Sequence, residues 1–339
     1  MTVRRAAGCL FGLACGDALG AETEFLSVDE IRRRYPPAGP QEPPGRPARV
    51  TDDTQMALAV ADALVAAPRP YAAATLEPHL RRAFVDWSVS PDNDRAPGMT
   101  CLTACGRLEQ GLPWYEATVV ASKGCGANMR VAPVGLLSQA RDGVDEETRA
   151  AIAQFQAALT HGHPTALAAS DLTAAAVAAL AAGEDLTALP RRLRAYAEDR
   201  RTVYHADWLG PLWQRPGVSG PSEFIARGWD ECLVVLDRLD RALARPDREA
   251  DPCQATGDGW IAEEAFATGL LCVLLYPDDP VAAVRRAALT RGDSDSIACL
   301  AGAFAGAAHG IGVWPEEWIA RIEYRDHLEA LGKRWDVPA

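Results

Sequence analysis

The stretch RGDSDSIACLAGAFAGAAHG, residues 291–310, joins a pair of aspartates to a long run of small apolar residues. From Ile297 onward the run contains almost no polar side chain, so it predicts a helix that lies in the protein core. Asp293 and Asp295 stand at the entrance of this helix, where a buried carboxylate is costly unless a partner neutralises its charge. The stretch therefore predicts a core helix and raises the question of what neutralises its two acids.

The rest of the chain has the same helical character. It contains 339 residues, of which 48% are hydrophobic and 24% are charged, as in an ordinary globular protein. The longest segments without Gly or Pro are rich in Ala and Leu at helical spacing, and no series of alternating Val, Ile and Thr residues indicates a sheet. The length alone would allow one large domain or two smaller ones. We expect an all-α fold in which residues 1–339 form a single domain.

Turn-forming residues divide the chain into expected helices and loops. Helices are expected over residues 4–20, 51–67, 71–90, 101–111, 145–160, 164–183, 229–243 and 259–276, and in the stretch after Asp295. Thr51 is the expected N-cap of its helix, since two acids that suit the first turn follow it. The Pro-rich residues 26–50, residues 91–100 and the aromatic residues 200–222 are expected to be loops, and the first of these is expected to be mobile.

Composition argues against several classes of protein. The formal net charge of −12 argues against a basic surface that grips nucleic acid. No window reaches the roughly 18 uninterrupted apolar residues of a membrane span. The N-terminal apolar run is interrupted by Gly8, Gly12 and Gly16 and lacks a convincing cleavage site, so we expect mature structure rather than a signal peptide. The nine cysteines include no CxxC pair, which predicts free thiols in a reducing cytoplasm.

Two acidic motifs, TDDT at residues 51–54 and DSDS at residues 293–296, lie where a loop enters an apolar helix. One interpretation is helix capping, in which each acid stabilises the helix dipole by roughly a few tenths of a kcal/mol. The other is a site for a hard cation, because Mg²⁺ prefers carboxylate and hydroxyl oxygens. Two divalent ions would remove the repulsion between converging carboxylates. No His or Cys pattern competes, which argues against zinc.

Five segments together make the chain resemble the ADP-ribosylglycohydrolase family. They read GCLFGLACGDALGAETEF from residue 8, TDDTQMAL from residue 51, KGCGANMRVAP from residue 123, LTHGHP from residue 159 and GDSDSIACLAGAFAGA from residue 292. The segments occur in the family's order and extend over nearly the whole chain; each is weak alone, but the combination is quite specific. The resemblance implies a compact all-α domain of orthogonal helices, with two magnesium ions in a central cleft.

The resemblance also implies metal ligands and a catalytic glutamate. A lone Glu in a loop, such as Glu22 or Glu24, would otherwise be expected to be a solvated surface residue. Glu24 matches a glutamate on a mobile flap in several family members. The implied magnesium ligands are Thr51, Asp52 and Asp53 from the first motif and Asp293, Asp295 and Ser296 from the second.

A Gly-rich loop in the family lies against ADP-ribose, and residues 123–130 resemble it. Without the resemblance, this loop could equally be a tight turn into a buried segment. His161 matches a histidine near the phosphates, although a lone histidine at this place would more often be a helix-end or core residue. The implied contacts to ADP-ribose are Gly124, Cys125, Gly126, Asn128, Met129 and His161.

The implied reaction is magnesium-dependent hydrolysis of the glycosidic bond between ADP-ribose and an acceptor, with Glu24, Asp52 or Asp53 as the general base. Two alternatives are a metal-dependent hydrolase of another ribosylated nucleotide or metabolite, and a module that binds ADP-ribose without cleaving it. Ala96 replaces an aspartate that helps select the acceptor in arginine-directed members. Arginine, serine, a nucleic-acid base and a small molecule stay open as acceptors. We expect the protein to act as a monomer in the cytoplasm.

Overall fold

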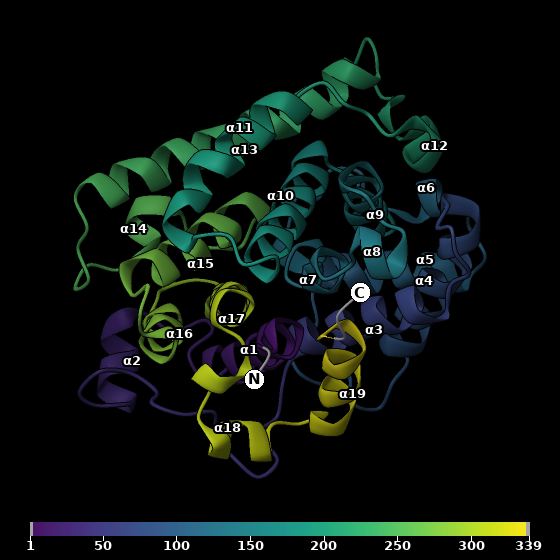
Figure 1. Ribbon diagram of the computed structural model, residues 1–339. Helices are drawn as coiled ribbons and strands as arrows, with labels where there is room; N and C mark the ends of the chain where they lie inside the picture. Colours follow the sequence, from purple (N-terminus) through teal and green to yellow (C-terminus); the bar gives the residue numbers. More distant parts are fainter. Residues whose placement is uncertain (1–2, 337–339) are drawn as a thin grey trace.

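The computed structural model describes residues 3–336, and Figure 1 shows a molecule built of helices. The described residues form nineteen α-helices and four short 3₁₀-helices. Pairing of β type is limited, within this range, to isolated bridges such as those joining Ala48 to Ile322 and Gly124 to Ile261. The expected all-α fold is confirmed.

The helices follow one another with short connections through most of the chain. The α-helices are α1 (Arg5–Gly20), α2 (Val28–Arg34), α3 (Asp52–Ala66), α4 (Ala73–Ser88), α5 (Met99–Glu109), α6 (Trp114–Ala117), α7 (Ala132–Gly135), α8 (Gln139–Asp142), α9 (Glu146–Ala158), α10 (Pro164–Ala181), α11 (Leu189–Arg200), α12 (Ala206–Leu209), α13 (Pro221–Ala244), α14 (Cys253–Thr256), α15 (Ala262–Leu275), α16 (Pro280–Ala288), α17 (Ser294–His309), α18 (Glu316–Arg321) and α19 (Arg325–Asp336). The 3₁₀-helices are η1 (Cys125–Ala127), η2 (Leu186–Ala188), η3 (Gly210–Trp213) and η4 (Ile311–Val313).

Helices α1 and α17 pack with their backbones in direct contact near the middle of the molecule (Figure 1). A methyl group added to Gly12 of α1 would overlap the carbonyl of Gly302 in α17, and one added to Gly302 would overlap the carbonyl of Gly12. Gly8 and Gly16 meet the backbone of α17 in the same way. Only residues without a side chain allow this approach, and it brings the last turn of α1 against the first turn of α17.

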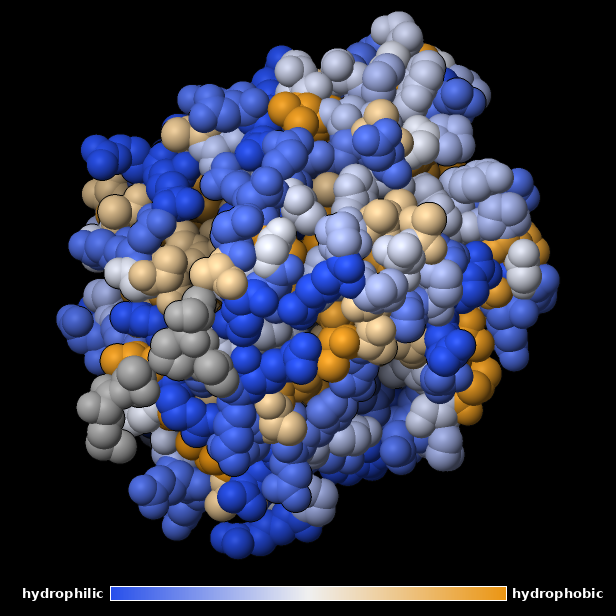
Figure 2. Space-filling model, turned by 45° about the vertical axis from the view of Figure 1, so that its right-hand side comes forward, coloured by the Kyte–Doolittle hydropathy of each residue, from blue (hydrophilic) through white to orange (hydrophobic). Residues whose placement is uncertain are grey.

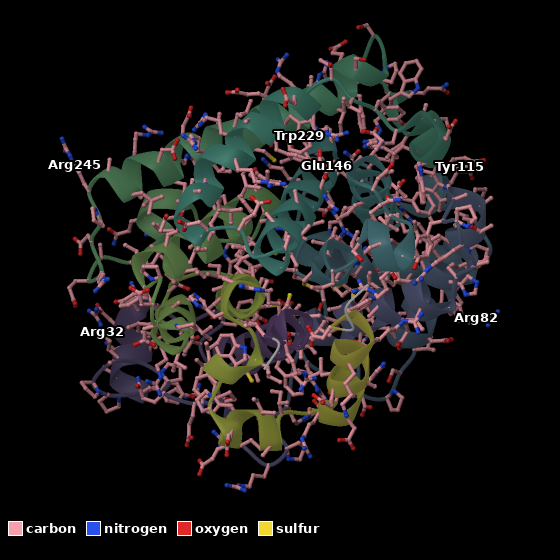
Figure 3. All side chains as sticks on the ribbon, in the orientation of Figure 1. Arg32, Arg82, Tyr115, Glu146, Trp229 and Arg245 are labelled. Atoms are coloured by element: carbon pink, nitrogen blue, oxygen red, sulfur yellow. The ribbon has the colours of Figure 1, made fainter. Side chains whose placement is uncertain are left out.

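The core is continuous around this pair of helices. A cluster of buried apolar residues extends from Ala6 of α1 to Trp335 of α19. Helix α10 is long and apolar enough to pass as a membrane span by length and composition, but 89% of its window is buried inside the protein. Trp229 of α13, labelled in Figure 3, is fully buried and packs against Tyr196 of α11.

Polar side chains dominate the outside. The face in Figure 2 is mostly hydrophilic, with apolar residues in scattered patches. Arg32, Arg82 and Arg245 extend from the edge of the molecule in Figure 3. All nine cysteines are buried and free.

Two expectations about local structure are wrong. Residues 26–50 are not a loop throughout, because residues 28–34 form α2. A capping box starts this helix: the Glu30 backbone N–H donates to Ser27 Oγ, and the Ser27 backbone N–H donates to Glu30 Oε2 at 2.8 Å. The irregular region 200–222 contains α12 and η3, and α13 begins at Pro221 rather than Trp229.

Candidate active site

A cavity of about 330 Å³ lies where the N-terminal ends of α3 and α17 meet the turn that follows α1. Most of the residues predicted to form the site line this cavity: Glu24, Asp52, Asp53, Gly124, Cys125, Gly126, Met129, His161, Asp293, Asp295 and Ser296. Thr51 and Asn128 are buried but are not among its lining residues. A larger cavity of about 430 Å³ lies between α3 and α4, but none of the predicted residues lines it.

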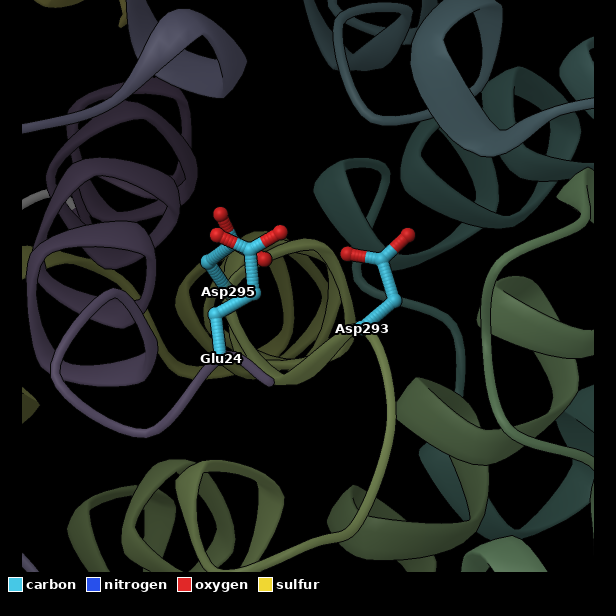
Figure 4. Close-up of side chains that lie close together, drawn as sticks. All are labelled: Glu24, Asp293 and Asp295. Atoms are coloured by element: carbon cyan, nitrogen blue, oxygen red, sulfur yellow. The ribbon is translucent and has the colours of Figure 1, made fainter. Parts of the chain in front are cut away.

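Three carboxylates gather at the start of α17. Oxygens of Glu24, Asp293 and Asp295 lie within 4.8 Å of one another, and Figure 4 shows Glu24 and Asp295 next to each other with Asp293 beside them. Asp293 is the N-cap of α17, Asp295 lies in its first turn, and Glu24 comes from the turn after α1. The close packing of α1 and α17 therefore joins acids that are about 270 residues apart in the sequence.

The first turn of α3 supplies two more carboxylates. Asp52 Oδ2 accepts a hydrogen bond of 3.1 Å from the Gly98 backbone N–H. Asp53 Oδ2 is buried and finds no hydrogen-bond donor among residues 3–336. A buried carboxylate oxygen without a donor is costly, so a bound cation is a natural partner for this atom.

Burial and mutual repulsion raise the pKa values of these acids. Burial is the largest cause for Glu24, whose pKa rises to about 9, and for Asp52, whose pKa rises to about 7; the nearby charges raise both values further. The pKa values of Asp53 and Asp293 are raised well above their usual range for the same reasons, and burial also raises that of Asp295. At neutral pH the cluster therefore holds protons unless cations replace them.

Asp17 supports the cavity from beneath, and sequence reasoning missed it. Its carboxylate accepts hydrogen bonds from the backbone N–H groups of Thr51 and Thr54 and from both hydroxyls. These bonds hold the first turn of α3 against α1. Burial raises the pKa of Asp17 to about 7, although its hydrogen bonds to Thr54 and Thr51 oppose the rise. A single acid within the apolar text of residues 8–20 was the available signal.

Thr51 acts as the expected N-cap of α3, because its Oγ1 accepts from the Asp53 backbone N–H. Its hydroxyl proton points to Asp17 Oδ1, at 2.7 Å. The proposed role of Thr51 as a metal ligand stays a prediction. Ser296 fits the proposed role of a metal ligand better, because it lines the cavity. Its backbone N–H donates to Asp295 Oδ1 at 3.0 Å.

The Gly-rich loop forms another wall. A Cβ atom on Gly126 would lie 2.9 Å from Cys101 Sγ and 3.1 Å from His161 Cε1, so this close approach requires glycine. The Cys125 backbone N–H donates to the Trp260 carbonyl at 3.1 Å and is not free for a phosphate. Asn128 Nδ2 donates to the Ala262 carbonyl at 2.9 Å, so this side chain joins the loop to α15 instead of facing the cavity.

Two aromatic residues at the rim were not predicted to belong to the site. Phe25 and Trp260 stack with their ring centroids 5.5 Å apart, and both line the cavity. They are 68% and 42% exposed, which is unusual for large apolar side chains. Phe25 has a φ of 65°, a conformation that non-glycine residues rarely adopt. The pair joins the Glu24 turn to the segment that precedes α15.

The loop before α5 completes the rim. Ala96, Pro97 and Gly98 line the cavity, and Ala96 has a φ of 52°. Arg95 anchors the loop, because its Nη2 lies 3.0 Å from Glu323 Oε1. Asp94 pairs with Arg49 at 2.9 Å and does not line the cavity. It therefore does not replace the aspartate that arginine-directed family members carry at the position of Ala96.

Comparisons with known proteins agree with this geometry. The sequence model that describes ADP-ribosylglycohydrolases matches residues 1–338. An ADP-ribosyl-[dinitrogen reductase] glycohydrolase of Rhodospirillum rubrum is 26% identical, and the alignment covers 96% of this chain and 92% of that protein. The human ADP-ribosylhydrolase ARH3 is also 26% identical, with 98% and 93% covered.

A solved structure described as an ADP-ribosylglycohydrolase-related protein complex has the same fold. It superposes with a TM-score of 0.64 over 98% of this chain and 96% of that one, at 23% sequence identity. The uncharacterized protein YegU of Escherichia coli strain K12 is 28% identical over 97% of this chain and 95% of its own length. The similarity therefore extends over whole chains and is not confined to the acidic motifs.

Proposed function

The chain belongs to the ADP-ribosylglycohydrolase family, and from this premise we propose that it is a magnesium-dependent hydrolase that releases ADP-ribose from an acceptor. The observation that carries the proposal is the convergence of five carboxylates, Glu24, Asp52, Asp53, Asp293 and Asp295, on one cavity. Relatives named for ADP-ribosyl hydrolysis support the same reaction. The proposed substrate is an ADP-ribosylated molecule, and the proposed product is free ADP-ribose.

The donors around the cavity suit magnesium. The ends of α3 and α17 and the Glu24 turn offer carboxylate and hydroxyl oxygens to it, which hard cations prefer. The unpartnered Oδ2 of Asp53 and the raised pKa values of the acids both favour a site that holds cations. Two bound ions would polarise and orient the ribose hydroxyls. Their proposed ligands come from Thr51, Asp52, Asp53, Asp293, Asp295 and Ser296.

The residues of the chain would then carry out the hydrolysis. The bond between C1 of the ribose and the acceptor breaks, and the oxygen of a water molecule bonds to C1. Charge on C1 becomes positive as the acceptor leaves, and the surrounding carboxylates stabilise it. Glu24, or one of Asp52 and Asp53, accepts the water proton, and the leaving acceptor takes up a proton. Glu24 is favoured because it lies beside Asp293 and Asp295 but is not itself among the proposed metal ligands.

A panel of ADP-ribosylated arginine, serine, nucleic-acid base and small-molecule substrates, assayed with magnesium or with EDTA, tests the proposal. We expect release of ADP-ribose from at least one acceptor, and only with the metal. Release of a different ribosylated product would favour the broader hydrolase alternative. Tight binding of ADP-ribose without turnover of any acceptor would contradict the proposal and favour a binding module.

The Glu24→Gln variant tests the proposed base, and Glu22→Gln is a matched control. Glu22 lies two residues away but bonds to Tyr35 and lies 3.8 Å from Arg34 Nη2, outside the cavity lining. We expect E24Q to lower kcat by roughly 10²- to 10⁴-fold while ADP-ribose still binds, and E22Q to keep its activity. Equal activity of the two variants would exclude Glu24 from the chemistry.

We also propose that residues 1–339 act as one domain, which the continuous core supports. Action as a monomer, a cytoplasmic location and the absence of a nucleic-acid-binding surface stay predictions.

A further inference from the structure

Arg130 is a fully buried cation beside the Gly-rich loop. Its guanidinium lies 4.3 Å from the centroid of the Phe84 ring, and its hydrogen-bond partners are all neutral. Burying a charge in this way is costly, and burial lowers the pKa of Arg130. A buried cation without an anionic partner therefore calls for a functional explanation.

The guanidinium joins the Gly-rich loop to the end of α9. Arg130 Nε donates to Gln156 Oε1 at 2.8 Å, and Nη2 donates to the Gln156 carbonyl at 2.8 Å. The Gln156 amide in turn donates to the Ala127 carbonyl at 3.0 Å. The same Nη2 also donates to Thr160 Oγ1 at 2.9 Å. Thr160 is therefore an acceptor for Arg130 at the residue directly before His161.

The single hydroxyl proton of Thr160 has two possible acceptors. His161 Nδ1 lies 2.8 Å from Oγ1, whereas the Ala157 carbonyl lies 3.4 Å away. That carbonyl already accepts the backbone N–H groups of Thr160 and His161, at 3.1 and 2.8 Å. The hydroxyl therefore donates to His161 Nδ1, which makes this nitrogen an acceptor.

A neutral imidazole with an acceptor at Nδ1 carries its proton on Nε2. His161 is neutral, because burial and the charge of Arg130 lower its pKa to about 3. The Nε2 edge lies next to Gly124 and Gly126, which line the same cavity as His161: a methyl group on these glycines would lie 3.5 and 3.4 Å from Nε2. The cavity thus receives one N–H donor from this ring.

We propose that Arg130 is a positioning residue that acts through Thr160 to hold His161 with its proton on Nε2, so that the ring offers the substrate a hydrogen-bond donor and not an acceptor. The inference rests on the proposed function for the identity of the substrate, but not for the position of the proton. A neutral N–H group of fixed direction suits an anionic oxygen, because such an oxygen can only accept hydrogen bonds.

Nitrogen NMR of the full-length protein labelled with ¹⁵N-histidine reads the proton position directly. We expect the wild-type protein to show an unprotonated Nδ1 and a protonated Nε2 at His161 throughout the neutral pH range. The His161→Asn variant identifies the signals. A protonated Nδ1 in the wild-type protein would overturn the inference.

Two substitutions at Thr160 separate the hydroxyl from the shape of the side chain. Thr160→Val keeps the shape and loses the hydroxyl, so we expect mixed tautomers and roughly 10-fold weaker binding of ADP-ribose by calorimetry with magnesium present. Thr160→Ser keeps the hydroxyl and should retain the wild-type spectrum and affinity within about twofold. A wild-type tautomer in T160V, or unchanged affinity despite a changed tautomer, would overturn the inference.

Arg130→Met tests the role of Arg130 in the chain of contacts from Arg130 through Thr160 to His161. Without the guanidinium the Thr160 hydroxyl is free to turn and to accept a hydrogen bond from Nδ1–H, so we expect the Nε2–H form to lose its dominance. If this variant does not fold, the T160V and T160S pair decides the matter. The NMR measurement needs no ligand, so absence of ADP-ribose binding would refute the proposed function, whereas the wrong tautomer would refute the positioning inference.

Discussion

The middle and the end of the α1–α17 pair solve opposite physical problems. Along the middle, Gly12 and Gly302 bring two backbones into contact in a dry apolar core. At the end, next to Gly20, the same helices hold Asp295 and the Glu24 turn close together. Burial raises the pKa values of both acids there, and the charge of Asp295 raises that of Glu24 further. The close packing along the middle of the two helices therefore holds the acids together at their end. Without it, the acids would repel one another and separate.

The comparison predicts that damage to the two regions will have different effects. A change in the glycine contact should affect folding, and a change in the acids should affect activity without loss of stability. Residues that work at functional sites are often poorly optimised for stability, so the acidic end is the place to expect this separation.

Gly302→Val should produce the largest effect. The added side chain would overlap the backbone of α1, which cannot move without separating the two helices, so we expect a loss of at least about 3 kcal/mol in the free energy of unfolding. Urea denaturation followed by circular dichroism measures it. Gly106→Ala in α5 is the control: no atom lies within 4 Å of its added methyl group, and it should be neutral or stabilising.

Asp295→Asn should abolish activity, with a decrease in kcat/KM of at least about 10³-fold, because a proposed metal ligand is lost. The free energy of unfolding of the ion-free protein should stay the same or rise, since a buried acid whose charge raises the pKa values of its neighbours is removed. Asp326→Asn, at a fully exposed position, should change neither quantity. Strong destabilisation of D295N without magnesium would contradict the separation of the two regions.

The stability of the ion-free protein should fall as the pH rises from 5 to 8. Folding raises the pKa of Asp52 to about 7 and that of Glu24 to about 9, so the folded state binds more protons than the unfolded state across this window. Stability contributed by these protons is present at low pH and lost as each folded pKa is passed. Chemical denaturation in EDTA at several pH values measures the slope, which should be smaller in D295N and should flatten when magnesium is added. Stability that rises with pH would contradict this explanation.

Trp260→Ala should have the smallest effect. It removes the stacking partner of Phe25 but leaves the Trp260 carbonyl that accepts from Cys125. We expect kcat/KM to fall by roughly 3- to 10-fold, the usual worth of an aromatic pair, with little change in unfolding. Tyr115→Ala removes an aromatic pair with Trp114 that does not line the cavity, and it should leave kinetics unchanged.

Much of the fold could be predicted from the sequence, because it follows from local patterns. The Ala-rich runs that become α1, α3, α10 and α17 are apolar on nearly every side, and such runs leave little choice but a buried helix. The paired acidic motifs identified one side of the cavity for the same reason: charges at the start of a core helix need a partner.

Features that depend on contacts between distant residues could not be predicted. The stack of Phe25 on Trp260 joins residues 235 positions apart. The direction of the Thr51 hydroxyl depends on Asp17 in another helix, and the Asn128 side chain turns away from the cavity to reach Ala262. Helix α2 is a different case, since the capping box of Ser27 and Glu30 is a local signal that the Pro-rich text after it obscured.

Divalent cations are proposed to neutralise the acids at the end of α1 and α17. Calorimetric titration of the ion-free protein with magnesium at neutral pH, repeated in two buffers of different ionisation enthalpy, tests it most directly. We expect saturable binding of two ions per chain with release of protons, because carboxyl groups with raised pKa values must lose their protons to bind metal. We expect D295N to lose this binding. Absence of saturable binding, or identical binding by D295N, would contradict the claim.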